Sequence, residues 1–393
     1  MRVLLVSGIF PPDHGGPASY VPAMAESLAE RGHSVRVLCL GSGGHWSNPH
    51  AFEVRRVRRG LFWPFRVLLT TVWIGHDARD VDVVYVNGLG VESALGAWWA
   101  GKPMVCKVVG DYAWERAVGL GVFSGTMEEY QKRDGHWFFK VLNFVRNWPL
   151  RRAVRVVVPS EYLRAMVCSW GMEEERVEVV LNAAPVAHGM PRVARIAGDP
   201  WEGRTLVTVC RLVPWKGVDG LIAMLSELPG TRLVVVGDGP ERGALVELAG
   251  RLGVAGRVCF VGEVSRRAVP AYLRAADAFV LNSSYEGLPH VVLEAMEVGV
   301  PVVATDAGGT GEVVVHERTG LLVPVGDGGA LLEAVRKLWD APGLAVQLVE
   351  AARLELGRRF SHEGMVGATE RVLAEAVQGG EGAGEVTEVG RAQ

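Results

Sequence analysis

The sequence predicts an α/β protein made of two doubly wound domains. Short Val-rich apolar runs alternate with amphipathic stretches along most of the chain, a pattern typical of parallel sheets with helices on both faces. The length of 393 residues suggests two or three domains. A stretch rich in Gly and Pro, without sustained periodicity, interrupts the series after residue 181. We therefore expect two domains with a cleft between them.

The expected elements follow one another in order. Strands are expected at 2–6, 35–40, 81–86, 104–108, 154–158, 177–181, 206–210, 232–236, 258–261, 278–281, 301–304 and 320–323. Amphipathic stretches that predict helices include 20–31, 217–228, 241–252, 269–276, 291–298 and 330–338.

These elements define the expected domains. An N-terminal domain occupies 1–185, a linker 186–204 and a C-terminal domain 205–378, whose last helix is expected to pack back on the N-terminal domain. The tail 379–393 lacks apolar periodicity, so we expect it to be disordered.

Composition excludes several classes of protein. The chain is 49% hydrophobic and 22% charged, which argues against a disordered or fibrous protein. Its net charge of −3 gives no reason to expect a nucleic-acid partner. The five cysteines are widely spaced and include no CxxC, so neither a disulfide framework nor a cysteine zinc site is expected.

The same reading bears on location. The first residues, MRVLLVSGIFPPD, look like a first strand and not like a signal peptide. The most apolar stretch, 61–74, is interrupted by Pro64 and Arg66 and is too short to span a bilayer. We expect a cytoplasmic protein.

The strongest chemical signal is EGLPHVVLE at 286–294, directly after an expected strand. Glu286 falls in the loop, Pro289 suits the first position of a helix, and Glu294 follows within it. Two carboxylates can accept hydroxyl hydrogen bonds, and a helix N-terminus suits phosphate, so the pattern indicates a polyhydroxylated phosphate ester. The peptide N–H groups expected to meet the anion are those near Gly287, Leu288 and His290. The alternative is that Glu294 is a solvated helix residue.

A second signal is RLVPWKG at 211–217, again between a strand and a helix. Arg211 offers a planar fork of donors and Lys216 a mobile point charge, and together they can neutralise a diphosphate. A solvated basic loop is the alternative.

Two glycine-containing loops follow other strands. Gly15 and Gly16 permit close approach of a ligand to the backbone, although such turns are common. The run VGDGPE contains Gly237 and Gly239 but has Arg242 where a GxGxxG fingerprint needs glycine, so a loop passing a base or ribose is the better interpretation. Glu263, after the next strand, would neighbour this loop.

In this order, the motifs RLxxxKG, VGDGP, FVG, EGLPxVxLEAM and GxPVVATDxGG resemble those of the retaining glycosyltransferases of family 4. The resemblance covers nearly the whole C-terminal half with high specificity, and the N-terminal half more loosely. It implies a GT-B fold, a nucleotide-sugar donor, a saccharide or lipid-linked acceptor, and no metal or other cofactor. Such an enzyme would serve cell-surface glycan or glycolipid synthesis.

The resemblance also implies residue roles. Arg211 and Lys216 would bind the donor diphosphate, Glu286 the sugar hydroxyls and Glu294 the ribose, while Gly15 and Gly16 would face the phosphate and acceptor side. Catalytic candidates are Glu286, Arg211, Lys216 and Asp111. Substrate-binding candidates are Gly15, Gly16, Gly237, Gly239, Glu263, Gly287, Leu288, Pro289, His290 and Glu294.

The sequence departs from the family in several places. Where many members have a histidine near the reacting sugar, this chain has Gly110 followed by Asp111, which could supply the polar contact. The usual Asn-Gly-Val-Asp before the linker is replaced by NAAP at 182–185. The DVD at 80–82 resembles a metal-binding motif, but its position before a strand favours a loop cap.

Two segments, 55–66 and 130–155, combine aromatic residues with positive charge, and nine of the 12 tryptophans lie within residues 1–170. This combination suits the interface of an anionic membrane, here its inner face. A core or cleft lining is the alternative. For the activity itself, the alternatives to a glycosyltransferase are a nucleotide-sugar epimerase or hydrolase of GT-B fold and a non-catalytic nucleotide-sugar-binding protein.

Overall fold

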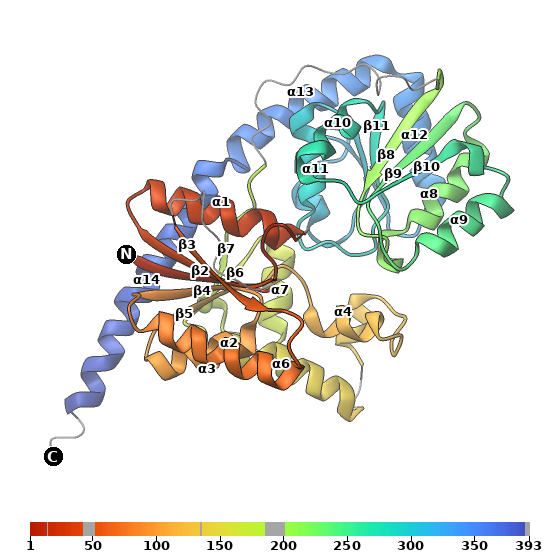
Figure 1. Cartoon of the computed structure of the whole chain (residues 1–393). Helices are drawn as coiled ribbons and strands as arrows, with labels where there is room; N and C mark the ends of the chain where they lie inside the picture. Colours follow the sequence, from red (N-terminus) through yellow and green to blue (C-terminus); the bar gives the residue numbers. More distant parts are fainter. Residues whose placement is uncertain (14, 42–51, 134–135, 185–200, 390–393) are drawn as a thin grey trace. The chain divides into compact units, whose positions relative to one another are not determined.

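The computed structural model describes residues 1–13, 15–41, 52–133, 136–184 and 201–389 (Figure 1). They form two compact units. Unit 1 contains Met1–Val180 together with Met365–Gln393, and unit 2 contains Leu181–Gly364. Most of the expected linker, 186–204, lies outside the described residues.

Unit 1 is built on a seven-stranded sheet in the order β3-β2-β1-β4-β5-β6-β7, and every adjacent pair is parallel. Its strands are β1 (Arg2–Ser7), β2 (Ser34–Gly41), β3 (Glu53–Arg58), β4 (Val83–Asn87), β5 (Met104–Lys107), β6 (Arg155–Val158) and β7 (Val177–Val179). Its helices are α1 (Gly16–Glu30), α2 (Trp63–Ala78), α3 (Gly90–Ala100), α4 (Tyr112–Gly119), α5 (Met127–Gln131), α6 (Trp137–Arg152) and α7 (Glu161–Ser169). In Figure 1, α2, α3 and α6 lie together on one face of the sheet and α1 lies on the other.

Unit 2 repeats the architecture with a six-stranded parallel sheet in the order β10-β9-β8-β11-β12-β13. Its strands are β8 (Arg204–Val209), β9 (Thr231–Val236), β10 (Val258–Gly262), β11 (Ala278–Leu281), β12 (Val302–Thr305) and β13 (Leu321–Val323). Its helices are α8 (Val218–Met224), α9 (Arg242–Arg251), α10 (Val269–Arg274), α11 (His290–Val298), α12 (Gly328–Asp340) and α13 (Pro342–Arg359). Two separate apolar cores cover the two faces of this sheet.

The last helix, α14 (His362–Val389), carries the chain from unit 2 into unit 1. The Glu370 carboxylate holds it to unit 1, lying 2.6 Å from the Arg31 guanidinium and 2.7 Å from His33 Nε2. Unit 2 therefore ends at Gly364, before the boundary of 378 that the sequence suggested. The helix α14 continues to Val389, and the expectation of a disordered tail from residue 379 stays a prediction. Extending an established helix adds one hydrogen bond for each residue fixed and needs no new nucleus.

All twelve predicted strands are present within two residues of their expected ends. The sequence analysis missed β3, with the sequence EVRRVR, because an edge strand paired only with β2 needs no continuous apolar run. Its arginines had instead been grouped with the basic and aromatic segment at 55–66.

Candidate functional site

Four loops follow neighbouring strands of unit 2 and meet at the carboxyl edge of its sheet. They come after β10, β9, β8 and β11, which are adjacent in that order. The loops after β8 and β11 are joined directly, since the Asn282 side-chain amide donates to the Gly217 carbonyl over 2.8 Å and the Ser284 amide donates to the Trp215 carbonyl over 2.8 Å. Motifs about 70 residues apart in the sequence are thus brought together.

An ion pair between Lys216 and Glu286 lies at the centre of this arrangement. Lys216 Nζ is 2.5 Å from Glu286 Oε1, and the Ser283 hydroxyl donates to the same oxygen over 2.6 Å. The backbone of Glu286 is fixed as well, because its carbonyl accepts from the Gly309 amide after β12. Glu286 is largely buried, and its second oxygen, Oε2, has no hydrogen bond or ion pair within the described part of the chain. One carboxylate oxygen is therefore left to accept from a ligand.

Unlike Lys216, Arg211 has no ion-pair partner among the described residues. Its side chain is exposed, and among the described residues no group forms a hydrogen bond or ion pair with its guanidinium. An unpaired cation in the same loop as Lys216 provides positive charge for an anionic ligand.

The loop after β9 packs tightly against the loop that carries Arg211. Gly237 has a φ of 127°, and a Cβ there would lie 2.0 Å from the Cys210 carbonyl oxygen. A Cβ at Gly239 would lie 2.3 Å from the Leu212 carbonyl oxygen. These glycines thus permit close contact between two loops of the protein. This structural role is separate from the predicted contact of the same glycines with a ligand.

Glu294 lies in α11 and pairs with a residue that the sequence analysis missed. Arg266, after β10, donates to Glu294 Oε1 over 3.0 Å. Burial raises the pKa of the Glu294 carboxyl, and the nearby Arg266 charge opposes that rise. The signal for Arg266 was available, because the dipeptide RR follows the strand next to the VGDGP loop. Glu263 is exposed in the same loop.

The start of α11 differs slightly from the prediction. Pro289 is the residue before the first helical turn, with a φ of −75° and a ψ of 100°, and the helix begins at His290. Gly287, Leu288 and Pro289 are buried, whereas His290 is half-buried. His290 is therefore the more accessible of these residues.

In unit 1, Gly15 and Gly16 lie at the start of α1, whereas Asp111 is buried. Gly15 precedes α1 with a φ of 132°, and Gly16 begins the helix with open space around its Cα. Both lie between β1 and the first turn of α1, and their contact with a ligand stays a prediction.

Asp111 is held inside unit 1. Its Oδ1 accepts from the amides of Ala113 and Trp114 at the start of α4, and its Oδ2 accepts from Gln131 and from Arg146, each over 2.6 Å. The residue has no exposed surface. In the structure the carboxylate is an N-cap and a buried ion-pair partner, which favours a structural role, and the catalytic role suggested by the sequence stays a prediction.

Asp80 and Asp82 pair with arginines. The Asp82 carboxylate accepts from the Arg2 amide over 2.8 Å and from its guanidinium over 2.7 Å, while Asp80 lies 3.8 Å from Arg36. Asp82 thus joins the chain before β4 to the start of β1, in keeping with the structural interpretation of the DVD motif.

Lys107, at the end of β5, is a buried cation that the sequence analysis did not single out. Its ammonium has no hydrogen-bond partner within the described residues and lies 4.1 Å from the centre of the Tyr20 ring. Burial lowers its pKa to about 7. A lysine at the end of the apolar run MVCKVV was the available signal.

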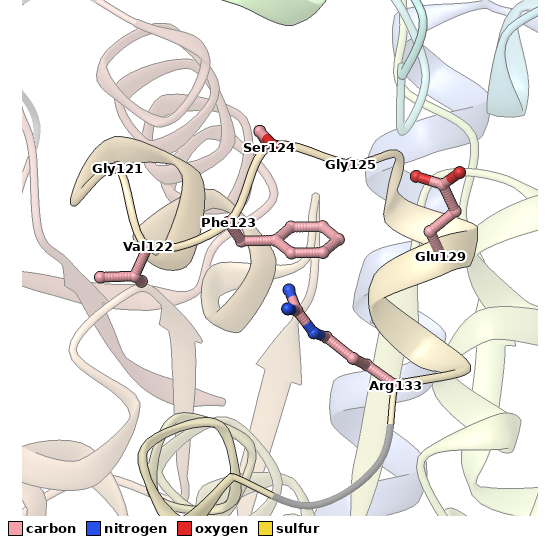
Figure 2. A pocket seen from close by; sticks show the side chains of 7 residues that line it. All are labelled: Gly121, Val122, Phe123, Ser124, Gly125, Glu129 and Arg133. Carbon is pink, nitrogen blue, oxygen red and sulfur yellow. The ribbon is translucent and has the colours of Figure 1, made fainter.

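Unit 1 also contains an open cavity of about 550 Å³ (Figure 2). Arg133 reaches the Phe123 ring, 4.8 Å from its centre, and Glu129 accepts from the Thr126 amide over 2.8 Å. None of the predicted site residues lines it. The lining residues are Gly121, Val122, Phe123, Ser124, Gly125, Glu129 and Arg133.

Comparison with known proteins identifies the family of the chain. The model described as "Glycosyltransferase Family 4" matches residues 14–188, and the model described as "Glycosyl transferases group 1" matches residues 194–355. A GDP-mannose-dependent alpha-(1-6)-phosphatidylinositol monomannoside mannosyltransferase of Mycolicibacterium smegmatis is 30% identical, over 89% of this chain and 92% of the relative. The chain belongs to glycosyltransferase family 4.

Two further comparisons concern a curated relative and a solved structure. LpsD of Rhizobium meliloti, a lipopolysaccharide core biosynthesis glycosyltransferase, is 38% identical to this chain. The match covers 54% of this chain and 60% of the relative. Anabaena HepE in complex with UDP and glucose superposes with a TM-score of 0.76 at 22% identity, over 95% of this chain and 99% of HepE. The expected GT-B fold is confirmed, and this protein is a glycosyltransferase.

None of the helices that the structure describes is both long enough and apolar enough to cross a membrane.

Proposed function

We propose that this glycosyltransferase moves a sugar from a nucleoside-diphosphate sugar to a saccharide or lipid-linked acceptor, with retention of anomeric configuration and without a metal. The observation that carries the proposal is the Lys216–Glu286 ion pair between the loops after β8 and β11, with Arg211 exposed in the first of these loops and Glu294 in the helix that follows the second. The chemistry of this set, with two cations and two acids, suits a ligand that joins a diphosphate to hydroxyl-rich sugars.

Each side chain then has a task. Arg211 and Lys216 bind the diphosphate and stabilise the negative charge that develops as it leaves, the contribution usually expected from a metal. Lys216 has three donor hydrogens, so it can keep Glu286 and still reach a phosphate oxygen. Glu286 Oε2 accepts from a hydroxyl of the transferred sugar, while Arg266 orients Glu294 toward the ribose.

The remaining predicted residues complete the donor site. The loop with Gly237 and Gly239 passes the base and ribose, and Glu263 neighbours it. The N-terminus of α11, with Gly287, Leu288 and His290, meets the diphosphate. Gly15 and Gly16 belong to the acceptor side. The leaving phosphate assists in taking the acceptor proton as the new glycosidic bond forms on the same face of the sugar.

The relatives support a nucleotide-sugar donor and a lipid-linked acceptor. One is described as GDP-mannose-dependent with a phosphatidylinositol mannoside substrate, one acts in lipopolysaccharide core synthesis, and the HepE structure contains UDP. Membership of a transferase family disfavours the epimerase and the non-catalytic alternatives. Lipid-linked acceptors also favour contact with a membrane at its cytoplasmic face.

Arg211 permits a clean test, because its side chain holds no part of the described fold together. We expect UDP or GDP to raise the melting temperature of the wild-type protein, and Arg211→Ala to weaken nucleotide binding roughly 10- to 100-fold in EDTA-containing buffer, as befits a lost charge-assisted hydrogen bond. Isothermal titration calorimetry measures this change.

The matched control is Arg251→Ala, another exposed arginine of unit 2, at the end of α9. It should bind nucleotide as the wild type does. Unchanged affinity in Arg211→Ala, or binding that disappears in EDTA, would contradict the proposed site.

A further inference from the structure

Three neighbouring helices of unit 1 have small residues at close contacts with one another and expose several large apolar residues. The pairs α2–α3 and α3–α6 pack side by side (Figure 1). The contact between α2 and α3 is close, because a Cβ on Gly75 would lie 2.3 Å from the Trp99 ring and one on Gly96 would lie 2.7 Å from Ile74. Ala78, Ala94 and Ala97 face the core under the sheet. Ile74, Leu142 and Leu150 are buried, but several other bulky side chains of these helices lie on the surface.

We name this surface the aromatic face. Phe65 and Leu68 are three residues apart on α2, and Trp137 and Phe144 are seven apart on α6, so each pair lies on one side of its helix. Six side chains define it, each more than 60% exposed: Trp63, Phe65, Leu68, Trp98, Trp137 and Phe144. Large exposed apolar surfaces of this kind mark sites of contact with another molecule.

The charges on the same helices identify the partner. Within Trp63–Ala78, Gly90–Ala100 and Trp137–Arg152, all described by the structure, the only acids are Asp77 and Glu92, and both are buried. Asp77 is paired with Arg55 over 2.9 Å, and burial raises the pKa of Glu92. The exposed charges of these helices are therefore cationic.

Cations lie both among and beside the exposed rings. Lys140 is exposed on α6 between Trp137 and Phe144. Arg79, just after α2, stacks over the Trp99 ring at 5.0 Å, and Arg152 lies 5.2 Å from the Trp148 ring centre. Indole rings prefer the headgroup level of a bilayer, and lysine and arginine bind anionic headgroups.

We infer that the aromatic face is the surface by which this enzyme docks on an anionic lipid bilayer. A second copy of the chain fits less well, because a symmetric dimer would oppose two cationic surfaces. The inference deepens the proposed function, in that it rests on a lipid-linked acceptor for its biological sense, but its physical basis lies in unit 1 and is independent of the donor site. It also adds α3, which lies in neither basic and aromatic segment identified in the sequence.

The test is co-sedimentation of the full chain with vesicles of phosphatidylcholine mixed with phosphatidylglycerol, and with vesicles of phosphatidylcholine alone. The wild type should bind the anionic vesicles, more weakly as salt is added. The triple variant Trp63→Ser, Trp98→Ser, Trp137→Ser should lose on the order of 100-fold in partition coefficient. Its melting temperature should stay at the wild-type value, since the replaced side chains are exposed.

A matched control removes three exposed apolar side chains from unit 2, with Val246→Ser, Val346→Ser and Leu354→Ser. It should bind vesicles like the wild type. The inference would be overturned if the wild type did not bind vesicles, bound neutral vesicles equally well, or if the two triple variants lost equal affinity. It would also be overturned if the protein formed a dimer in solution that dissociated only in the tryptophan variant. Nucleotide affinity, measured in parallel, reports separately on the proposed function and should be the same in both variants.

Discussion

Both oxygens of the Asp111 carboxylate accept hydrogen bonds within unit 1. These bonds favour a structural role for this residue over a catalytic one. Four hydrogen bonds converge on it, from two amides of α4, from Gln131 and from Arg146. Arg146 in turn lies 3.9 Å from the centre of the Trp170 ring. The carboxylate therefore joins α4, α5 and α6.

Asp111→Asn should destabilise the protein by about 3–5 kcal/mol, because it leaves the buried Arg146 without its counter-ion. Chemical denaturation measures the loss. The control is Asp80→Asn. Asp80 is exposed and forms only a long ion pair of 3.8 Å with Arg36, so this substitution should change stability little. Transfer activity per folded molecule should survive in Asp111→Asn. A variant of wild-type stability that no longer transfers sugar would restore the catalytic interpretation.

Lys107 gives the stability of unit 1 a specific dependence on pH. Its pKa is lowered from 10.5 to about 7 by burial, with the Tyr20 ring offsetting part of that cost when the ammonium is charged. Between these values the unfolded chain holds a proton that the folded protein does not. The contribution of Lys107 to the free energy of unfolding therefore rises from about pH 7 to pH 10.5, and the full cost of burying the charge is present below pH 7.

Lys107→Met should remove this slope and raise the free energy of unfolding at neutral pH, because a thioether chain of similar length is buried without a charge. Denaturant titrations across this pH range measure both effects. The exposed Lys132→Met serves as the control and should keep the wild-type slope. An identical pH dependence in Lys107→Met would show that another group titrates there.

At the level of elements, the proposed donor site depends on how two loops are joined. Gly217 has a φ of 57° before α8, and a Cβ there would lie 2.2 Å from the Asn282 carbonyl oxygen after β11. The glycine therefore lets the loop that carries Lys216 meet the loop that carries Glu286.

Gly217→Ala should lower stability by at least about 1–2 kcal/mol and weaken nucleotide binding, because alanine is strained at this φ and its methyl group forces the loops apart. Calorimetry and denaturation measure the two effects. Gly243→Ala, within α9 and with open space at its Cα, should leave nucleotide binding unchanged and stability equal or up to about 1 kcal/mol higher. Equal behaviour of the two variants would contradict the importance of this loop contact.

An apolar pattern in the sequence can identify a helix without showing which of its faces is buried. The stretch 61–74 is apolar enough to suggest burial, yet α2 exposes Phe65 and Leu68 and buries Thr70 and Gly75. Periodicity indicates that a helix has two different faces. Which face meets the core depends on the size of the residues on the neighbouring helix, here Gly96 and Ala97 of α3.

At the level of the whole molecule, the chain forms unit 1, then unit 2, and then returns to unit 1 through α14. The return depends on polar groups distant in sequence. Tyr20 and Tyr85 share a hydrogen bond of 2.7 Å, and the Thr369 hydroxyl of α14 reaches both. Glu370 adds its pairs with Arg31 and His33. The boundary at Gly364 is set by these contacts, which no local pattern in the sequence reveals.

The sequence alone determined the strands, their order along the chain and the motifs of the proposed donor site, because apolar runs, glycines and charged residues beside strand ends are local features. The EGLPHVVLE and RLVPWKG motifs belong to this class. Only the tertiary structure decided that Glu286 pairs with Lys216, that Glu294 pairs with Arg266, that Asp111 is enclosed and that the tryptophans of α3 face outward. These facts depend on which distant groups the sheets bring within a few ångströms, and contact and desolvation arise from the fold as a whole.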